Sequence, residues 1–442
     1  MIKLSYITPT GGSSGGDGIR TRYEIPTTSS ILEKQVSTTL VSNFGQSGTI
    51  TWTLPIAKKE LDFIAQIGTA TGSDYIIIKP PIGESLLLIT DHPYFVTQID
   101  CKDANEGDSI WFRVIESVVD GNFIWFGTII AGDWLTSNDF FWCVGGVQNS
   151  AQVNLNREMN IKTNAWSLNT PYPVTIQAGS SAMIGGDMYV GAGNSGGDTT
   201  PYPYISAFNF ITQTWSSSIS VSWQYKNVSF IGIGSLGYYH SAAIGSLTAG
   251  MQIFDKTLSS WTTKFPANTT VRVKTYSFGS KNTGQTGHGI FYSCGGPPIG
   301  APPTDLTYFY YPPSDAFINK TTYPVGGRSE GGSFRKNETE GNCWGGINAS
   351  AWEPTADNYK FTNSGSGAWT GETNIPFIFS NAGGNIGCGA GGKGYLTGGS
   401  RDWTGSTACS QYFNTAWTLM TPYPATYINY QSTTSFGENA VA

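Results

Sequence analysis

The chain has 442 residues and a formal net charge of −6; 12% of its residues are charged, 14% are aromatic and 56 are glycine. This composition excludes a disordered chain, which would combine few aromatic side chains with a higher density of charge. It also lacks the basic character of nucleic-acid-binding proteins. Abundant glycine, serine and threonine with few charges instead predict an all-β protein with many turns.

Residues 1–47 predict an extended N-terminal arm or attachment segment. The apolar run near Met1 is too short for a secretory signal, and no segment of the chain reaches the apolar length of a membrane span. The Gly/Ser-rich stretch Gly11–Gly18 cannot form a packed element alone. We expect this arm to become ordered against a partner, and a tail without fixed structure is the alternative.

Residues 48–135 predict a small β-sandwich or barrel. Short apolar or alternating segments, separated by proline, glycine and Asp-Gly turns, are typical of strands and hairpins. The seven expected strands lie at 49–55, 61–67, 74–81, 85–90, 94–100, 109–117 and 122–130.

This region also resembles the small β-modules of bacteriophage tail-fibre and capsid-fibre proteins. The resemblance rests on Thr-Leu-Pro at 53–55, the Ile-rich strand before Pro80, and the closing pair Gly-Asp-Ser-Ile-Trp-Phe (107–112) and Gly-Asn-Phe-Ile-Trp (121–125). It implies a part of a virus particle, and an unrelated β-sandwich remains the alternative.

Residues 136–442 contain one unit six times: an apolar strand ending in glycines, a loop, an aromatic strand and an aromatic anchor. Its most complete copy is Gly394–Pro424. The anchors, 46 to 56 residues apart, are Trp166, Trp215, Trp261, Phe317, Trp369 and Trp417. A repeat near 50 residues with Gly-Gly, Tyr and Trp landmarks resembles the kelch family.

The kelch resemblance implies a six-bladed β-propeller over about residues 139–442. Trp166 and Trp417 are both followed by Thr-Pro-Tyr-Pro, but only the first copy is followed by a further glycine strand. We therefore expect the stretch after Ala425 to complete the first blade. Such closure removes exposed sheet edges.

The sequence contains no recognisable catalytic or metal-binding motif, so we expect no enzyme, no cofactor and no metal site. The three histidines are isolated, and the six cysteines show no Cys-x-x-Cys spacing. Cys143, Cys294 and Cys343 each precede a double glycine, and we expect them to be buried structural thiols. Copper-oxidase-like and sialidase-like propellers need ligand or arginine motifs that are not found here.

Loops between the glycine strand and the aromatic strand carry the best candidates for ligand binding. Aromatic faces stack on sugars, and neighbouring charged or amide groups read the hydroxyls. The candidates are Arg401, Asp402, Trp403, Trp352, Glu353, Tyr202 and Tyr204, with Trp223 and Tyr225 in a connection between blades.

These observations favour a virion structural protein of a tailed bacteriophage, of the tail-fibre or receptor-binding type. The N-terminal region would dock to other virion proteins, and the propeller would bind host-surface glycan or protein through many weak contacts. The resemblance to phage appendages implies a homotrimer. The alternatives are a capsid decoration or head-fibre protein, a propeller enzyme acting on surface polysaccharide, and an intracellular kelch adaptor. The adaptor would require a helical N-terminal domain, and the β-rich region 48–135 disfavours it.

Overall fold

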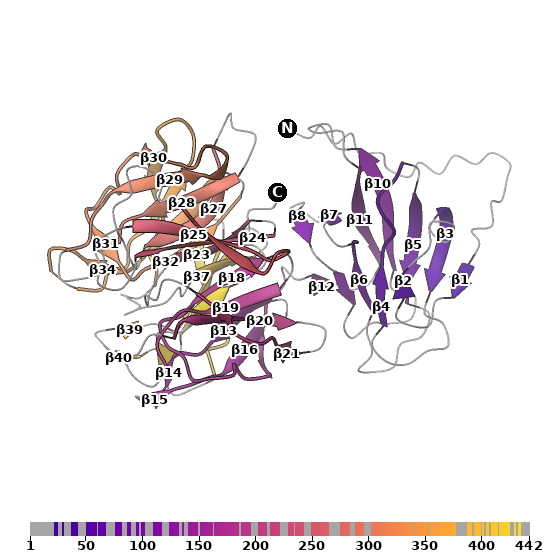
Figure 1. Ribbon diagram of the computed structural model, residues 1–442, viewed down its shortest axis with the longest axis horizontal. Coiled ribbons are helices and arrows are strands. Elements are labelled where there is room, and N and C mark those ends of the chain that lie inside the picture. The colour runs from indigo at the N-terminus through magenta and orange to yellow at the C-terminus, as the bar shows by residue number, and fades with distance from the viewer. Residues whose placement is uncertain are drawn as a thin grey trace. The chain divides into compact units, whose positions relative to one another are not determined.

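The computed structural model divides the chain into two compact units, Met1–Ser137 (unit 1) and Asn138–Ala442 (unit 2) (Figure 1). It describes residues 22–24, 29–30, 37–42, 50–59, 61–67, 76–81, 86–89, 94–96, 99–101, 109–116, 123–131, 135–136, 140–148, 151–161, 163–184, 187–195, 202–209, 213–221, 229–233, 235–242, 249–264, 275–282, 288–295, 302–337, 339–351, 353–376, 387–390, 393–398, 400–401, 404–405, 408–413, 415–424, 428–429 and 432–434. Within these residues both units are all-β, and no helix has the length and apolarity that a membrane span requires.

Unit 1 is built from two sheets. The larger runs in the order β1-β3-β5-β10-β11-β7-β8 and the smaller in the order β12-β9-β6-β4-β2. The strands are β1 (Arg22–Glu24), β2 (Ser29–Ser30), β3 (Ser37–Ser42), β4 (Ile50–Thr53), β5 (Asp62–Gln66), β6 (Ile76–Lys79), β7 (Leu86–Ile89), β8 (Tyr94–Val96), β9 (Ile99–Cys101), β10 (Ser109–Glu116), β11 (Phe123–Ala131) and β12 (Leu135–Thr136).

A shared apolar core makes these two sheets a sandwich. In β5, Phe63 and Ala65 are buried while their neighbours are half-buried, as alternation along a strand dictates. The same core cluster holds Trp52 from the smaller sheet and Trp125 from the larger. The indole of Trp125 donates a hydrogen bond to the carbonyl of Pro55 (2.8 Å), so this buried ring keeps its polar atom paired.

The structure corrects two boundaries of unit 1. The segment 1–47 is not separate from the sandwich, because β1 and β3 extend the larger sheet in parallel and β2 pairs with β4. The second boundary falls after residue 137 instead of 135, since β12 pairs with β9. The expected strand 94–100 is two strands, β8 and β9, which belong to different sheets.

Unit 2 contains six sheets of four or five strands within the described residues, together with small two- and three-stranded sheets. The strands are β13 (Phe140–Val144), β14 (Val147–Gln148), β15 (Ala151–Gln152), β16 (Asn156–Asn160), β17 (Ala165–Asn169), β18 (Ser180–Ile184), β19 (Asp187–Gly191), β20 (Tyr204–Asn209), β21 (Thr214–Trp215), β22 (Ile219–Ser220), β23 (Ser229–Ile233), β24 (Leu236–Ala242), β25 (Ala249–Asp255), β26 (Ser260–Lys264), β27 (Tyr276–Lys281), β28 (His288–Ser293), β29 (Thr307–Tyr311), β30 (Ala316–Lys320), β31 (Arg328–Ser329), β32 (Gly332–Arg335), β33 (Glu340–Trp344), β34 (Ile347–Asn348), β35 (Asn358–Thr362), β36 (Ala368–Gly371), β37 (Gly387–Ala390), β38 (Lys393–Thr397), β39 (Ser400–Arg401), β40 (Thr404–Gly405), β41 (Cys409–Phe413), β42 (Ala416–Leu419), β43 (Ile428–Asn429) and β44 (Ser432–Thr434).

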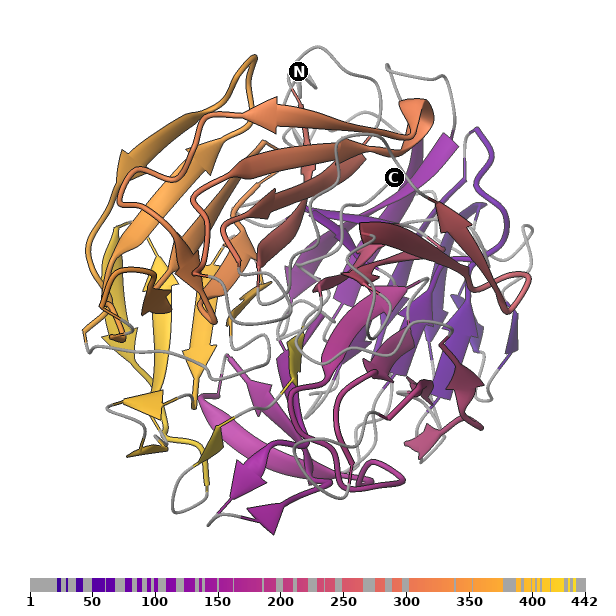
Figure 2. The same ribbon diagram turned by 60° about the vertical axis from the view of Figure 1, so that its left-hand side comes forward.

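The six sheets follow one another in a cycle. Their first strands are neighbours in the order β18, β23, β27, β32, β37 and β44, and β44 lies beside β18 again. The C-terminal strand β44 pairs antiparallel with β13, so that it is the inner strand of the first sheet. Figure 2 shows the sheets disposed around a centre, with the yellow C-terminal strands next to the magenta ones. The described part of unit 2 therefore forms a closed arrangement in which the chain's last described strand completes its first sheet.

The aromatic anchors join neighbouring sheets by a recurrent hydrogen bond. In each instance the indole of a tryptophan anchor donates a hydrogen bond to a backbone carbonyl of the preceding sheet. The acceptor is a threonine that lies four residues after that sheet's own anchor. The pairs are Trp166–Thr421 (3.0 Å), Trp215–Thr170 (2.9 Å), Trp369–Thr321 (2.9 Å) and Trp417–Thr373 (3.0 Å). At three of these junctions the residue two positions after the threonine is a tyrosine that packs edge-on against the same indole: Tyr172 on Trp215 (4.7 Å between centroids), Tyr323 on Trp369 and Tyr423 on Trp166. At the fourth junction, after Thr373, that residue is Ile375. We call this indole–threonine hydrogen bond between neighbouring sheets the clamp, and the Thr-Pro-Tyr-Pro sequence supplies its acceptor at Thr170 and Thr421.

The double glycines allow close approach of the backbone between successive sheets. The amide of Gly146 donates to the carbonyl of Ile176 (2.7 Å). A Cβ atom at Gly145 would lie 2.4 Å from that carbonyl oxygen, and one at Gly346 (φ +92°) would lie 2.5 Å from the oxygen of Ser329. Glycine is required because no other residue leaves room for the incoming segment.

The cysteines named in the sequence are buried, and Cys143 and Cys343 occupy equivalent positions on β13 and β33. Cys294 follows β28 at a different position, where its amide donates to the residue just before the next strand, as those of Gly145 and Gly345 do. Cys143, Cys294 and Cys343, with Cys409, are free and buried. Burial raises the pKa of the Cys143 and Cys343 thiols well above its usual range and that of Cys409 to about 12. These thiols stay protonated, so they act as small apolar groups.

Candidate ligand-binding surface

At one end of the sheets in unit 2 lie the described segments that carry predicted ligand-binding residues. Because the strands of each sheet alternate in direction, the loops from second to third strand meet the connections between successive sheets at this end. Backbone pairs show the meeting: Gly295 donates to the carbonyl of Arg328 (2.6 Å), and β14 pairs with β43. We call this the loop end. Loops supported by rigid sheets are common places for binding residues.

Those of the nine predicted residues that the structure describes fall on segments that lead to or from this end. Four of the nine, Tyr202, Tyr204, Glu353 and Arg401, lie within the described residues, Arg401 by its backbone alone. The other five lie outside the described residues: Trp352, Asp402, Trp403, Trp223 and Tyr225. The structure therefore tests the placement of the tyrosine pair most directly.

Tyr202, which is half-buried, and Tyr204, which is exposed, form a pair of angled rings. Their centroids are 5.4 Å apart with an interplanar angle of 62°, and Tyr204 is 39% exposed. The hydroxyl of Tyr202 lies 3.4 Å from the Oγ atom of Ser218. Ser220 is the cross-strand partner of Tyr204, so its hydroxyl lies on the same side of the sheet. We call these four residues the tyrosine platform.

The backbone and the core hold this platform in place. The amide of Tyr202 donates to Gly193 (2.7 Å), and the carbonyl of Pro203 accepts from Val221 (2.8 Å). Beneath it, the fully buried ring of Tyr172 packs edge-on against Tyr202 (6.4 Å). Burial raises the pKa of the Tyr172 hydroxyl well above its usual range, and this hydroxyl donates to the carbonyl of Val190 (3.0 Å). Tyr172 thus anchors the clamp and supports the platform.

Glu353 and Arg401 occupy other loops of the same end. Glu353 is exposed, and its carbonyl accepts from the amide of Asn348 (2.9 Å) in a tight turn after β34. Arg401 belongs to β39, which pairs with β40 through Thr404. Among the described contacts, none joins either residue to the tyrosine platform. Of the four described residues, Tyr202 and Tyr204 are in contact with each other.

The sequence missed a buried ion pair at the loop end. The guanidinium Nε atom of Arg328 lies 3.3 Å from Oδ2 of Asp357, which also accepts from the hydroxyl of Tyr323 (3.4 Å). Arg328 is only 6% exposed. Burial raises the pKa of Tyr323 well above its usual range, so its hydroxyl remains a donor. The double glycine before Arg328 marks this segment in the sequence. The ion pair could not be predicted from it, because Asp357 lies 29 residues after Arg328.

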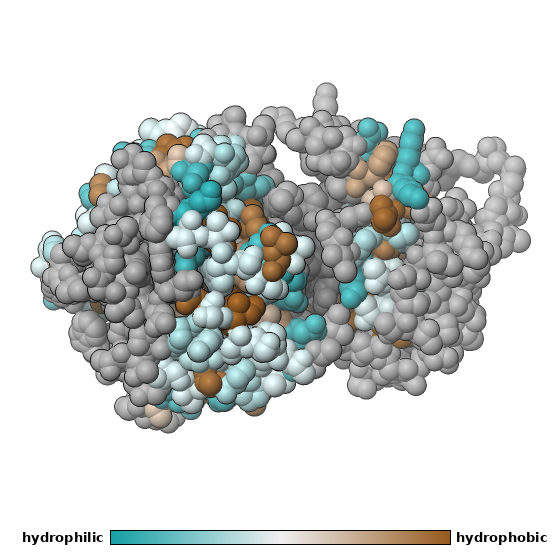
Figure 3. Space-filling view, in the orientation of Figure 1, coloured by the Kyte–Doolittle hydropathy of each residue, from teal (hydrophilic) through white to brown (hydrophobic). Residues whose placement is uncertain are grey.

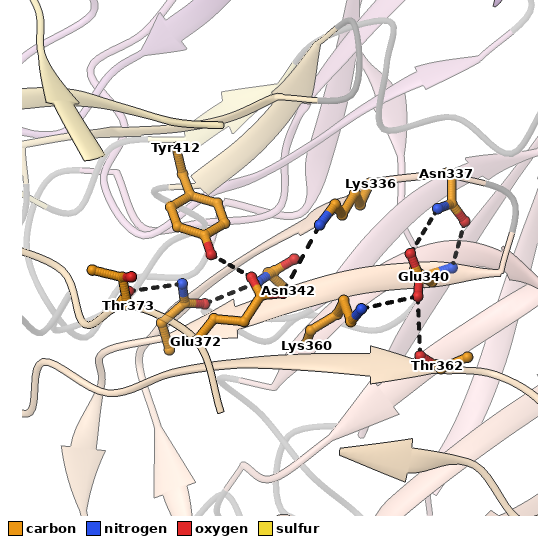
Figure 4. Close-up of polar contacts among 10 residues, drawn as sticks. Lys336, Asn337, Glu340, Asn342, Lys360, Thr362, Glu372, Thr373 and Tyr412 are labelled. Atoms are coloured by element: carbon orange, nitrogen blue, oxygen red, sulfur yellow. Dashed lines mark hydrogen bonds and ion pairs between the residues drawn. The ribbon is translucent and has the colours of Figure 1, made fainter. Parts of the chain in front are cut away.

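A second polar network, also missed, lies between the fifth and sixth sheets (Figure 4). Glu372 accepts hydrogen bonds from the hydroxyl of Tyr412 and from Nδ2 of Asn342 (2.9 Å), and its other oxygen lies 3.9 Å from Nζ of Lys336. The Glu372 side chain is 6% exposed. Burial, and then the contact with Glu372, raise the pKa of Tyr412. This carboxylate is fully engaged by donors from two sheets.

The visible surface of unit 2 is weakly polar. In Figure 3 most of its described surface is pale, and the brown and teal areas are small and scattered. No group of three or more histidine, cysteine, aspartate or glutamate residues within the described ranges could hold a metal ion. The exposed tyrosine platform is therefore the best-defined candidate site among the described residues.

The chain matches no family model and no curated protein. Among solved structures it is similar to the one titled "Structure of YjhT", with a TM-score of 0.50 and 10% sequence identity. The match covers 64% of this chain and 98% of that chain. At this identity the likeness concerns the fold alone. It agrees with the cyclic arrangement of sheets and defines an all-β protein that is β-propeller-like.

Proposed function

We propose that unit 2 is a six-bladed kelch-like β-propeller and that the chain is a structural protein of a tailed-bacteriophage particle. In this proposal the propeller binds host-surface glycan or protein, and unit 1 docks to other virion proteins. The tail-fibre or receptor-binding type is preferred. A homotrimer is the expected assembly, because many weak sites acting together give strong attachment.

The observation that carries the binding role is the exposed tyrosine platform on a rigid scaffold. Two rings, one of them 39% exposed, stand at the loop end although the same unit buries most of its large aromatic side chains. An aromatic side chain that is fixed and left exposed favours contact with a ligand. The six sheets and their cyclic order support the count of blades.

The particle role rests on the sequence of unit 1 and on its sandwich fold. The quoted motifs fall on the hairpin of β10 and β11 and on β4 and β6. The charged residues buried in unit 2, such as Arg328 and Glu372, are paired within the protein. A buried charge strongly destabilises the fold when it loses its partner, so pairing of this kind is what we expect of a rigid scaffold that holds binding loops.

The test is to label purified particles with an antibody against the full chain and to image them. Labelling at the tail, together with competition between the purified chain and particles for adsorption to host cells, is the expected result. Labelling of heads supports the capsid decoration alternative. Release of reducing sugar from host polysaccharide supports an enzyme. Absence of the chain from particles overturns the proposal.

A further inference from the structure

Two stretches of sequence that contain the tyrosine platform and the supporting Tyr172 are free of charge. From 163 to 186 and from 199 to 225 the sequence has no aspartate, glutamate, lysine or arginine, although 12% of the whole chain is charged. Two charged residues lie between these segments: Asp187, which is paired with Lys256 (2.8 Å), and the anionic Asp198, four residues before Tyr202 in sequence. The platform is therefore a neutral surface in a region where several charges would be expected from composition alone.

The polar atoms around the rings are hydroxyls. Ser216, Ser217, Ser218 and Ser220 are all exposed, and they follow Trp215 directly in sequence. A serine hydroxyl both donates and accepts, so it can satisfy another hydroxyl in either direction. The rings supply apolar faces, and the serines supply the matching polar rim.

The rings need little reorganisation to receive a ligand. Prolines flank Tyr202, two backbone hydrogen bonds hold the segment, and Tyr172 supports it from below. A preformed site loses less conformational entropy on binding than a mobile one.

We propose that Tyr202 and Tyr204 form a stacking subsite for a neutral saccharide, with Ser218 and Ser220 reading its hydroxyl groups. This deepens the proposed function and rests on it for the biological source of the sugar. The C–H face of a pyranose ring fits an aromatic face, and its edge carries hydroxyl groups with which serine hydroxyls can form hydrogen bonds. An acidic sugar lacks a cationic partner among the residues of these segments. A protein partner would require a far larger surface than two rings.

The experiment uses saturation-transfer difference NMR on the full-length protein. The probes are methyl β-D-galactopyranoside, methyl α-D-glucopyranoside and methyl N-acetyl-β-D-glucosaminide, with galacturonic acid as the anionic counterpart of galactose. At least one neutral glycoside is expected to receive saturation on the protons of one ring face, with millimolar affinity. Galacturonic acid is expected to bind at least about fivefold more weakly.

Matched variants separate the platform from other tyrosines. Tyr204→Ala is expected to weaken the neutral glycoside about fivefold or more, whereas Tyr204→Phe retains it because the ring remains. Tyr311→Ala is the control, since Tyr311 lies on the third strand of another sheet, at the end away from the loops. Circular dichroism checks that each variant is folded.

Three results would each overturn the inference: no saturation of any neutral glycoside, equal binding by galacturonic acid, or undiminished binding by Tyr204→Ala. Each is distinguishable from a failure of the proposed function. If no glycoside binds but the chain is found on particles and competes for adsorption, the proposed function stands and the subsite fails. If glycosides bind but particles lack the chain, the subsite stands and the proposed function fails.

Discussion

Two junctions between sheets of unit 2 use the same indole–threonine hydrogen bond and differ in the residues around it. At the junction of the first and second sheets, Trp215 packs on Tyr172, and Tyr172 in turn supports a neutral platform with the exposed ring of Tyr204. At the junction of the fifth and sixth sheets, Trp417 lies beside a buried network centred on Glu372. The clamp is common architecture, so the differences identify what each junction adds: an open surface in one, internal cross-linking in the other.

The largest effect is expected from breaking the buried network. Glu372→Ala leaves Asn342, Tyr412 and Lys336 without their shared acceptor, and it should lower the free energy of unfolding by about 3 kcal/mol. Urea unfolding followed by tryptophan fluorescence measures this. Glu353→Ala, at an exposed carboxylate of the loop end, should change it by no more than about 0.5 kcal/mol. Equal effects of the two changes would refute an internal role for Glu372.

The clamp itself should contribute a smaller amount at both junctions. Trp215→Phe and Trp417→Phe remove the indole donor and should each cost about 1 kcal/mol more than Trp261→Phe. Trp261 is the matched control because its Nε1 atom is buried and has no hydrogen-bond partner among the described residues, so this change removes none of the described hydrogen bonds. The same unfolding measurement applies. A loss at Trp261 as large as at the other two would mean that ring packing, and not the hydrogen bond, explains the clamp.

A third test uses pH at the second group in Figure 4. Burial raises the pKa of Glu340, but hydrogen bonds from Asn337, Lys360 and Thr362 outweigh it and lower the pKa overall. Because the folded-state pKa lies below the unfolded value, Glu340 contributes stability above the unfolded pKa, and this is lost as pH falls through the folded one. Melting temperatures should therefore fall less steeply for Glu340→Gln than for the wild type between roughly pH 5 and 3. Melting temperatures that fall equally with pH in the wild type and in Glu340→Gln would contradict a lowered pKa of Glu340.

The smallest effect on stability is expected at the open platform. Tyr204→Ala should alter the free energy of unfolding by less than about 0.5 kcal/mol, because the side chain is 39% exposed. Calorimetry of the variant checks this value. A loss comparable to that of Glu372→Ala would show that the ring is a packing element, and the contrast between the two junctions would disappear.

The repeated parts of this fold could be predicted from sequence because each repeat marks them locally. The anchors and double glycines fall on the outer strands and the loop end, and Thr-Pro-Tyr-Pro falls on the clamp. The inner strands were not marked, since β18 and β37 consist mainly of small residues without an anchor. The fusion of β1 to β3 with the sandwich was also hidden, because short strands beside glycine-rich segments carry little periodic signal.

The candidate site was predictable only in part, for a related reason. Tyr202 and Tyr204 are two residues apart in sequence, so proximity could be read directly. Glu372 and Tyr412 are 40 residues apart, and their contact follows only from the packing of one sheet on the next. Side chains that meet across repeats leave no spacing rule in a single sequence.

The pairing of β44 with β13 has a consequence for synthesis of the protein. The first sheet lacks its inner strand until residues 432–434 have left the ribosome, nearly three hundred residues after β13. Until then β13 presents an unsatisfied edge to whatever surrounds the nascent chain. Chaperone binding to the early repeats, and its release once translation ends, would be the cellular counterpart of this late closure.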